Sequence, residues 1–229
     1  MIKLPKFDEQ SMFDYETFNS LTTNEERIGK FLAHYEAMKL AVNIPGEIVE
    51  CGVFKGTSLM RFALMRQIMG GQNSAKIFGF DVFSNKYPKT KYKEDNIQRD
   101  HWINTAGAKS IGDEQLKKLF LKKGIKNFSL IPGDVNKTIP KFIKRNPGFK
   151  ISLLNIDIDF VEPTLTTLKY FYNCVSKGGI ILFDNYAGKG NSGEYLFGDT
   201  KGIDDFFKDK SIDIKRFSFT ARPCYLVKK

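Results

Sequence analysis

Acidic and amide side chains follow two apolar segments of the chain, at the point where each segment ends. Asp157 and Asp159 close the segment NIDIDF, and Asp184 and Asn185 close the segment LFDNY. Side chains alternate along a strand, so Asp157 and Asp159 would share one face of a regular strand. If the two segments are neighbouring parallel strands, three carboxylates and one amide gather at one edge of the sheet. Such a cluster favours a bound cation, and its oxygen ligands suit Mg²⁺ or Ca²⁺. The alternative is a set of exposed loop acids surrounded by water.

A glycine-containing turn, ECGVFKGTS, follows another apolar segment. Gly52 and Gly56 would let a ligand approach the backbone closely. Their spacing differs from the GxGxxG dinucleotide fingerprint, and the charge of Glu50 disfavours a pyrophosphate. That charge suits a ligand with an ammonium group, such as the methionine end of S-adenosylmethionine. We therefore expect Glu50, Gly52, Gly56, Thr57 and Ser58 to contact this cofactor; a plain structural turn is the alternative.

Two further aspartates stand at the ends of apolar segments. Asp81 ends GFD, where a carboxylate can accept hydrogen bonds from the ribose hydroxyls of a nucleoside. Asp134 ends PGD on the same rim and could face the adenine, and Asp157 is a further expected cofactor contact. Each could instead be a turn residue or a helix cap. Together with the glycine turn, these strand ends carry what a nucleoside-linked amino acid requires.

The elements that must position these residues alternate along the chain. Apolar segments that predict strands span residues 47–52, 76–81, 128–134, 150–159 and 178–186. Segments with helical periodicity or helix-start signals span residues 24–42, 57–69, 113–123 and 163–175. Residues 211–219 and 221–229 predict a final strand pair. Strands that alternate with helices indicate an α/β fold of the Rossmann-like type, with a mostly parallel, seven-stranded sheet flanked by helices.

Two segments interrupt or precede this alternation. The first ~20 residues show little periodicity and predict an irregular arm. We expect residues 1–45 to form an N-terminal arm and helix that pack on a single globular domain of residues 46–229. Residues 84–112 are long, charged and aromatic, and predict either a lid over the site or a surface excursion that contains a short helix.

The composition favours a protein without a membrane partner. No stretch approaches the ~20 consecutive apolar residues of a membrane span. The N-terminus does not resemble a secretory signal, and the three scattered cysteines show no CxxC spacing, so we expect a cytoplasmic protein. The net charge of +10 could attract nucleic acid or phosphorylated molecules. The lysines fall mostly on the polar sides of predicted helices, so we interpret them as solvated faces and expect no nucleic-acid partner.

Five motifs in order resemble the macrocin O-methyltransferase family: IVECGVFKGTSL, GFDVF, NIDIDFVEPT, GGIILFDNY and GDTKGIDDFF. The resemblance covers residues 24–229 and implies a class I, S-adenosylmethionine-dependent methyltransferase that acts on sugar hydroxyls. It also implies Mg²⁺ held by the residues Asp157, Asp184 and Asn185. Many sugar-modifying members have two aspartates at the last two positions, so Asn185 is a departure that lowers the negative charge of the site.

The resemblance further implies a catalytic base. Catechol-type enzymes place a lysine three residues after the first metal aspartate, where this chain has Phe160. Sugar-type enzymes place an aspartate two residues after it, and in this chain that residue is Asp159. The resulting hypothesis is that two neighbouring hydroxyls of the acceptor bind the metal and Asp159 removes a proton. The oxygen then attacks the sulfonium methyl group.

The expected partner is a hydroxylated small molecule, such as a sugar in a natural product, a nucleotide sugar or a polysaccharide precursor. By resemblance, we also expect a homo-oligomer. Three other functions are compatible with parts of the sequence: a catechol-like O-methyltransferase, a nucleic-acid methyltransferase and a non-catalytic assembly subunit. Phe160 argues against the first, the absence of an appended RNA-binding module against the second, and the intact acidic set against the third.

Overall fold

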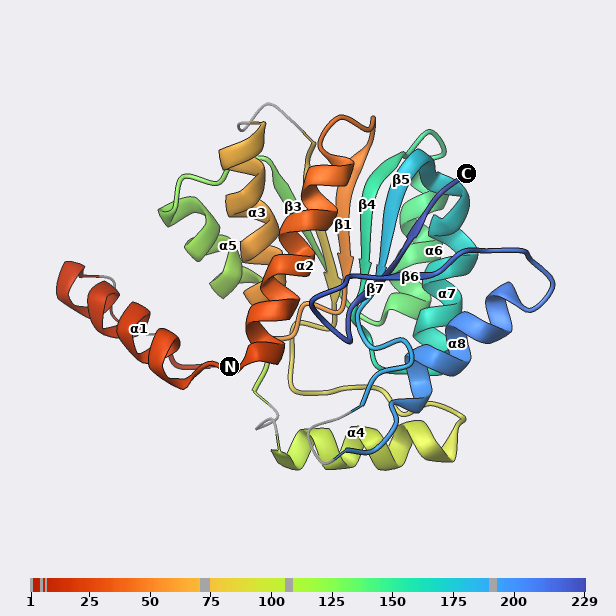
Figure 1. The fold of residues 1–229 in the computed structure, drawn as a ribbon, viewed down its shortest axis with the longest axis horizontal. Helices are drawn as coiled ribbons and strands as arrows, with labels where there is room; N and C mark the ends of the chain where they lie inside the picture. Colours follow the sequence, from red (N-terminus) through yellow and green to blue (C-terminus); the bar gives the residue numbers. More distant parts are fainter. Residues whose placement is uncertain (1, 5, 7, 71–74, 106–108, 190–192) are drawn as a thin grey trace.

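A seven-stranded sheet with the order β3-β2-β1-β4-β5-β7-β6 forms the centre of the computed structural model (Figure 1). The structure describes residues 2–4, 6, 8–70, 75–105, 109–189 and 193–229. The strands are β1 (Glu47–Cys51), β2 (Ile77–Asp81), β3 (Phe128–Pro132), β4 (Ile151–Ile156), β5 (Val175–Phe183), β6 (Lys215–Arg216) and β7 (Cys224–Val227). Strands β1 to β5 pair in parallel, and β7 runs antiparallel to both β5 and β6. The predicted sheet and its final strand pair are confirmed.

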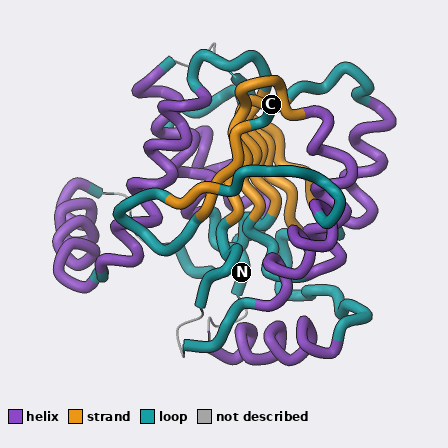
Figure 2. Tube along the Cα trace, turned by 45° about the vertical axis from the view of Figure 1, so that its right-hand side comes forward, coloured by secondary structure: helices purple, strands orange, loops and turns teal. Residues whose placement is uncertain are grey.

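Helices cover both faces of this sheet, as Figure 2 also shows. One face carries α2 (Glu25–Ala41), α3 (Thr57–Met69) and α5 (Asp113–Lys122). The other carries α6 (Val135–Arg145), α7 (Val161–Phe171) with the short 3-10 helix η1 (Tyr172–Cys174), and α8 (Phe197–Phe207). Helices α1 (Glu9–Thr22) and α4 (Lys93–Thr105) lie outside these two layers. None of the described helices is both long and apolar enough to cross a membrane.

The continuous apolar strands follow from this two-sided burial. Ile48 of β1 packs in the core beneath α2 and α3, and its neighbour Val49 packs in the core beneath α6 and α7. Leu153 and Leu154 of β4 divide between the two cores in the same way. A strand buried on both faces needs apolar residues at successive positions, so its sequence shows a run instead of an alternation.

The N-terminal segment differs from the predicted irregular arm, because residues 9–22 form helix α1. The Asp8 side chain caps this helix by accepting a hydrogen bond from the Ser11 backbone N–H. No residue of α1 is buried, so the segment has none of the apolar periodicity that core packing imposes. The helix projects away from the body of the molecule in Figure 1.

The ends of β4 and β5 meet at one edge of the sheet. Strand β4 ends at Ile156, so Asp157 and Asp159 lie beyond it, and Asp159 has a left-handed backbone with φ of 71°. The prediction that these two aspartates continue a regular strand is therefore wrong. Backbone bonds still align the strand ends: Asp157 N–H donates to Cys51 O at 2.8 Å, and Asp184 N–H donates to Ile156 O at 3.0 Å.

The insertion of residues 84–112 lies across the carboxyl ends of the strands, where α4 is visible at the bottom of Figure 1. Residues 106–108 of the predicted insertion lie outside the described residues. The buried carboxylate of Asp95 in α4 accepts bonds from the Val161 N–H at 3.0 Å and the Thr90 hydroxyl at 2.9 Å. These contacts tie α4 to the start of α7. The insertion thus contains the expected short helix and also covers the strand ends.

Candidate active site

A pocket of about 700 Å³ opens at the carboxyl ends of β1, β2 and β4. Residues of the insertion form one wall, where the Trp102 ring packs against Phe54 and Tyr87 with both ring centroids 4.7 Å away. The predicted residues that line it are Gly52, Asp81, Asp134, Asp157 and Asp159. The structure therefore brings the glycine turn and the first part of the acidic cluster to one cavity.

The glycine turn is held against the end of β4. Gly52 has φ of +92°, and a Cβ atom there would lie 1.8 Å from the Asp157 carbonyl oxygen. A close approach of two backbones therefore requires glycine at this position, whether or not a ligand is bound. Gly56 precedes α3 with φ of +81° and is buried, as is Ser58, whereas Thr57 is exposed.

The Asp81 carboxylate organises the loops around the pocket. One oxygen accepts bonds from Val53 N–H at 2.7 Å and Phe54 N–H at 2.9 Å, and the other accepts from Phe83 N–H at 3.0 Å. Asp134 caps α6 by accepting a bond from Asn136 N–H at 2.9 Å. The structure thus shows the capping role that was the alternative for Asp134. Both aspartates also line the pocket.

Glu50 is fully buried beside this turn. Its Oε1 accepts a hydrogen bond from the Asn155 side-chain amide at 2.8 Å, and its Oε2 has no hydrogen-bond partner among the described residues. Burial raises the pKa of Glu50 to about 7. A cationic ligand group that reached this carboxylate would therefore favour its charged form.

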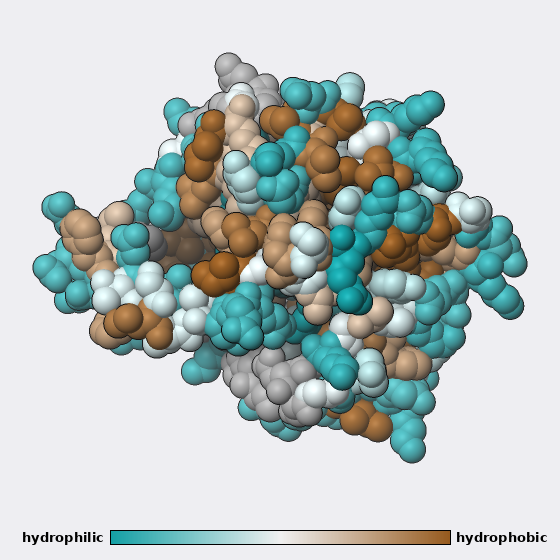
Figure 3. Space-filling view, viewed as in Figure 1, coloured by the Kyte–Doolittle hydropathy of each residue, from teal (hydrophilic) through white to brown (hydrophobic). Residues whose placement is uncertain are grey.

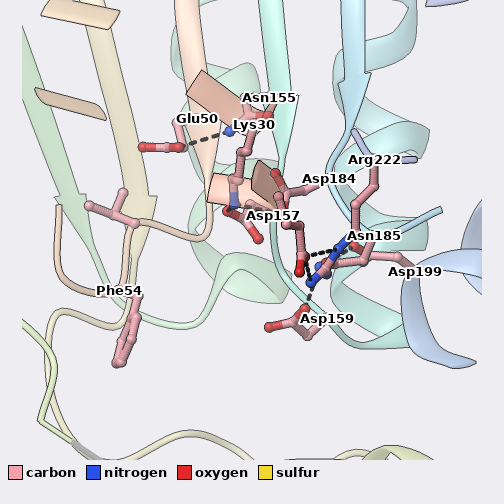
Figure 4. Close-up of polar contacts among 12 residues, drawn as sticks. Lys30, Glu50, Phe54, Asn155, Asp157, Asp159, Asp184, Asn185, Asp199 and Arg222 are labelled. Atoms are coloured by element: carbon pink, nitrogen blue, oxygen red, sulfur yellow. Dashed lines mark hydrogen bonds and ion pairs between the residues drawn. The ribbon is translucent and has the colours of Figure 1, made fainter. Parts of the chain in front are cut away.

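The acidic cluster contains a cation that the sequence analysis did not identify. Lys30 of α2 extends to the sheet edge, where its Nζ lies 3.1 Å from Asp157 Oδ2 and 2.8 Å from Asp184 Oδ2 (Figure 4). The contact with Asp184 has the length of a charge-assisted hydrogen bond, and the contact with Asp157 is longer. Lys30 is 127 residues from Asp157 in the chain, so local spacing gives no signal for this contact.

A second polar group surrounds Asn185. Its amide nitrogen donates to Asp159 Oδ1 and, at 3.2 Å, to Asp199 Oδ2. Its amide oxygen accepts a bond of 2.5 Å from Arg222 Nη1, and Arg222 also pairs with Glu26. Asp199 lies in GDTKGIDDFF, one of the five motifs of the resemblance, so the sequence offered a signal that could have identified it as a further carboxylate of the site. Arg222 had no such signal.

Burial and mutual repulsion shift the ionisation of these carboxylates. Burial, followed by the charge of Asp184, raises the pKa of Asp159 to about 6. Burial, followed by the charge of Asp159, raises the pKa of Asp199 to about 8. Burial also acts to raise the pKa of Asp184, but the Lys30 ammonium outweighs it and lowers that pKa. The Lys30–Asp184 pair is therefore the charged centre of the cluster.

As arranged, these residues do not fit Mg²⁺. The ammonium of Lys30 lies between the two carboxylates that would bind the ion, and Arg222 holds the amide oxygen of Asn185. Asp184 Oδ1 is a buried oxygen without a partner among the described residues, and a Mg²⁺ ion bound there would need waters or acceptor oxygens to complete its coordination. The described part of the chain contains no group of three or more His, Cys, Asp or Glu that could hold a metal ion.

His34 lies one helical turn after Lys30 and is fully buried against Phe62. Burial, followed by the nearby Lys30 charge, lowers the pKa of His34 from 6.5 to about 3. The unfolded chain therefore binds a proton that the folded chain excludes as the pH falls below 6.5. Below pH 6.5 this excluded proton lowers the free energy of unfolding of the wild type by about 1.4 kcal/mol per pH unit, and we expect His34→Leu to lack this loss.

Urea unfolding of the wild type and His34→Leu at about pH 8 and about pH 5 measures this effect. The stability that the wild type loses between the two conditions should exceed the loss of the variant. Equal losses would contradict a neutral, buried imidazole.

Comparison with known proteins identifies the family. The family model described as Macrocin-O-methyltransferase (TylF) matches residues 9–213. The chain belongs to the macrocin-O-methyltransferase family. The resemblance inferred from the five motifs is thus confirmed, and the match extends over most of this family member, including α1.

Two curated relatives of this family member come from Streptomyces. The 8-demethyl-8-(2,3-dimethoxy-alpha-L-rhamnosyl)-tetracenomycin-C 4'-O-methyltransferase of Streptomyces olivaceus is 26% identical over 65% of this chain and 56% of its own length. The demethyldecarbamoylnovobiocin O-methyltransferase of Streptomyces niveus is 27% identical over 63% of this chain and 54% of its own length. The matches thus span little more than half of each relative.

Solved structures support the fold. A calicheamicin methyltransferase superimposes with a TM-score of 0.70 at 21% identity, over 94% of this chain and 85% of that one. The O-methyltransferase NovP superimposes with a TM-score of 0.71 at 18% identity, over 88% of this chain and 80% of that one. The chain therefore has the class I methyltransferase fold predicted from its sequence.

Proposed function

We propose that this chain is an S-adenosylmethionine-dependent O-methyltransferase that acts on a hydroxyl of a sugar or sugar-containing small molecule. The observation that carries the proposal is the pocket at the strand ends. It is lined by Gly52, Asp81 and Asp134 on the proposed cofactor side and by Asp157 and Asp159 on the proposed acceptor side. Family membership and the sugar-containing name of the tetracenomycin relative support the reaction and the substrate class.

The proposed cofactor site uses the turn after β1. The unpartnered Oε2 of Glu50 would accept from the ammonium group of the methionine part. Asp81 already holds the loop through three backbone N–H groups, which leaves lone pairs on its oxygens for the ribose hydroxyls. Asp134, the glycines of the turn, Thr57 and Ser58 complete the proposed contacts.

The proposed base is Asp159. Its carboxylate lines the pocket, and burial raises its pKa to about 6, which suits a group that exchanges a proton near neutral pH. Asp159 removes the proton of the acceptor hydroxyl as the oxygen attacks the methyl carbon. The carbon–sulfur bond breaks with its electron pair on sulfur, which leaves S-adenosylhomocysteine. The resemblance predicted Mg²⁺, but the residues as arranged do not fit this ion, and the proton transfer requires only side chains of the chain itself.

Titration calorimetry with S-adenosylmethionine, followed by methyl transfer to nucleotide-linked deoxysugars, tests the proposal. We expect micromolar cofactor binding to the wild type and weaker binding to Asp81→Asn. The amide has only one oxygen that can accept the backbone N–H bonds made to residue 81, so the loops that frame the pocket are held less firmly. Asp205→Asn, which changes an exposed carboxylate paired with Lys201, is the control. Absence of cofactor binding to the wild type would overturn the methyltransferase assignment.

The expected homo-oligomer stays a proposal, and the surface of α1 supports it. Large apolar side chains of α1 are exposed: Met12, Phe13, Phe18 and Leu21. Brown and tan areas lie over this helix in Figure 3. An isolated helix of this length is marginally stable in water. We therefore propose that a second copy of the chain packs on the exposed apolar side chains of α1.

Sedimentation velocity tests this proposal. We expect the wild type to sediment as a dimer or larger assembly. For Phe13→Ser/Phe18→Ser we expect the dissociation constant of this assembly to rise by at least about tenfold. Ile68→Ser, which changes an exposed apolar residue on α3, is the control. A monomeric wild type would refute the assembly.

A further inference from the structure

The ammonium of Lys30 occupies the centre of the acidic cluster. Its side chain is 20% exposed, and its Nζ makes bonds of 3.1 Å and 2.8 Å to the carboxylates of Asp157 and Asp184. Helix α2 fixes the base of this side chain, because it is buried in the core on the same side through Ala33 and Ala37. The cation is therefore held from a rigid element that packs directly on the sheet.

The third predicted metal ligand is also engaged by a basic side chain. Asn185 Oδ1 accepts the bond of 2.5 Å from Arg222, and the Asn185 amide nitrogen faces Asp159 and Asp199. Figure 4 shows Lys30 and Arg222 approaching the cluster from two sides. All three predicted ligands of the metal thus contact a cation that the chain itself supplies.

A divalent ion and the ammonium would compete for one place. Mg²⁺ binds oxygen ligands at about 2.0–2.1 Å. An ion at that distance from both carboxylates would lie next to the ammonium, which contacts the same two groups, and the like charges would repel each other. The end of β5 carries one carboxylate and one amide, Asp184 and Asn185, where many sugar-modifying members have two carboxylates. This fits the arrangement, because a single positive charge requires less negative charge than a double one.

We propose that Lys30 is a built-in cation that takes the place of the divalent metal at this site. An ammonium has three N–H donors, and the contacts with Asp157 and Asp184 use two of them. The third donates to an oxygen of the acceptor and stabilises the negative charge that develops as Asp159 removes the proton. This role rests on the proposed methyl transfer, whereas the exclusion of a divalent ion does not depend on it.

Mn²⁺ titration followed by electron paramagnetic resonance tests the exclusion without any assay of activity. Mn²⁺ shares the oxygen-ligand preference of Mg²⁺. We expect the wild type to bind Mn²⁺ no more tightly than about 1 mM, and Lys30→Met to bind one ion at least about tenfold more tightly. The gain should disappear in Lys30→Met/Asp184→Asn. Lys39→Met, which removes an exposed lysine paired with Glu36 on the same helix, should bind like the wild type.

Two outcomes would overturn the proposal. One is tight binding of a single Mn²⁺ by the wild type that Asp184→Asn abolishes, a result that does not require Lys30→Met to fold. The other is a folded Lys30→Met that gains no ion. Methyl transfer by the wild type should persist in EDTA, and its loss on chelation would likewise refute a built-in cation. Calorimetry with S-adenosylmethionine reports separately on the proposed function, so the two ideas can fail independently.

Discussion

Asp159→Asn is expected to lower kcat by about 10²–10⁴-fold while leaving the affinity for S-adenosylmethionine nearly unchanged. The amide has the shape of the carboxylate but cannot take the proton of the acceptor hydroxyl. Asparagine also tolerates the left-handed backbone that residue 159 adopts, with φ of 71°. The fold and the bond from Asn185 to the side-chain oxygen should therefore survive the substitution.

Single-turnover methyl transfer and calorimetry measure the two quantities separately. Asp205→Asn provides a matched control, because Asp205 is an exposed aspartate on α8 that pairs with Lys201 away from the pocket. A variant Asp159→Asn that binds the cofactor and retains near-normal turnover would show that another group accepts the proton.

Gly52→Ala is expected to lower the free energy of unfolding by about 3–4 kcal/mol and to abolish cofactor binding. The added Cβ would lie 1.8 Å from the Asp157 carbonyl oxygen, and hydrogen bonds to the sheet hold the backbones of both Gly52 and Asp157 in place. Either the turn after β1 or the end of β4 must move. Both contribute residues to the pocket, so stability and cofactor binding should fall together.

Gly124→Ala separates the clash from the cost of the backbone conformation. Gly124 also has a positive φ, of +72°, but a Cβ there would meet no heavy atom within 4 Å. We expect Gly124→Ala to lower the free energy of unfolding by about 1 kcal/mol and to leave cofactor binding unchanged. Urea unfolding and calorimetry on both variants give the comparison, and equal losses of stability would argue against the tight approach at Gly52.

Local signals accounted for most of the fold. The buried strands appear as apolar runs because each is covered by helices on both faces. Helix α2 begins at the capping side chain of Asn24, whereas α3 follows Gly56 without a side-chain cap, so a cap by Thr57 or Ser58 was the wrong start signal for α3. Helix α1 lacked a signal because none of its residues is buried. The backbone conformation at Asp159 could not be predicted either, since the segment that packs closely against it, the start of α8, lies far along the chain. A Cβ on Gly198 of that helix would lie 2.0 Å from the Asp159 carbonyl oxygen.

The sequence by itself determined the doubly covered parallel sheet, the glycine turn, the carboxylates at the strand ends and the family, because each depends on residues close together in the chain. Only the tertiary structure decided which charges meet. Lys30 reaches Asp157 and Asp184 from 127 and 154 residues away, and Arg222 reaches Asn185 from the loop before β7. These pairings follow from where α2 and the last strand pair pack on the sheet. Composition and spacing therefore predicted a cation among the acids, and the fold places the ammonium of the chain itself there.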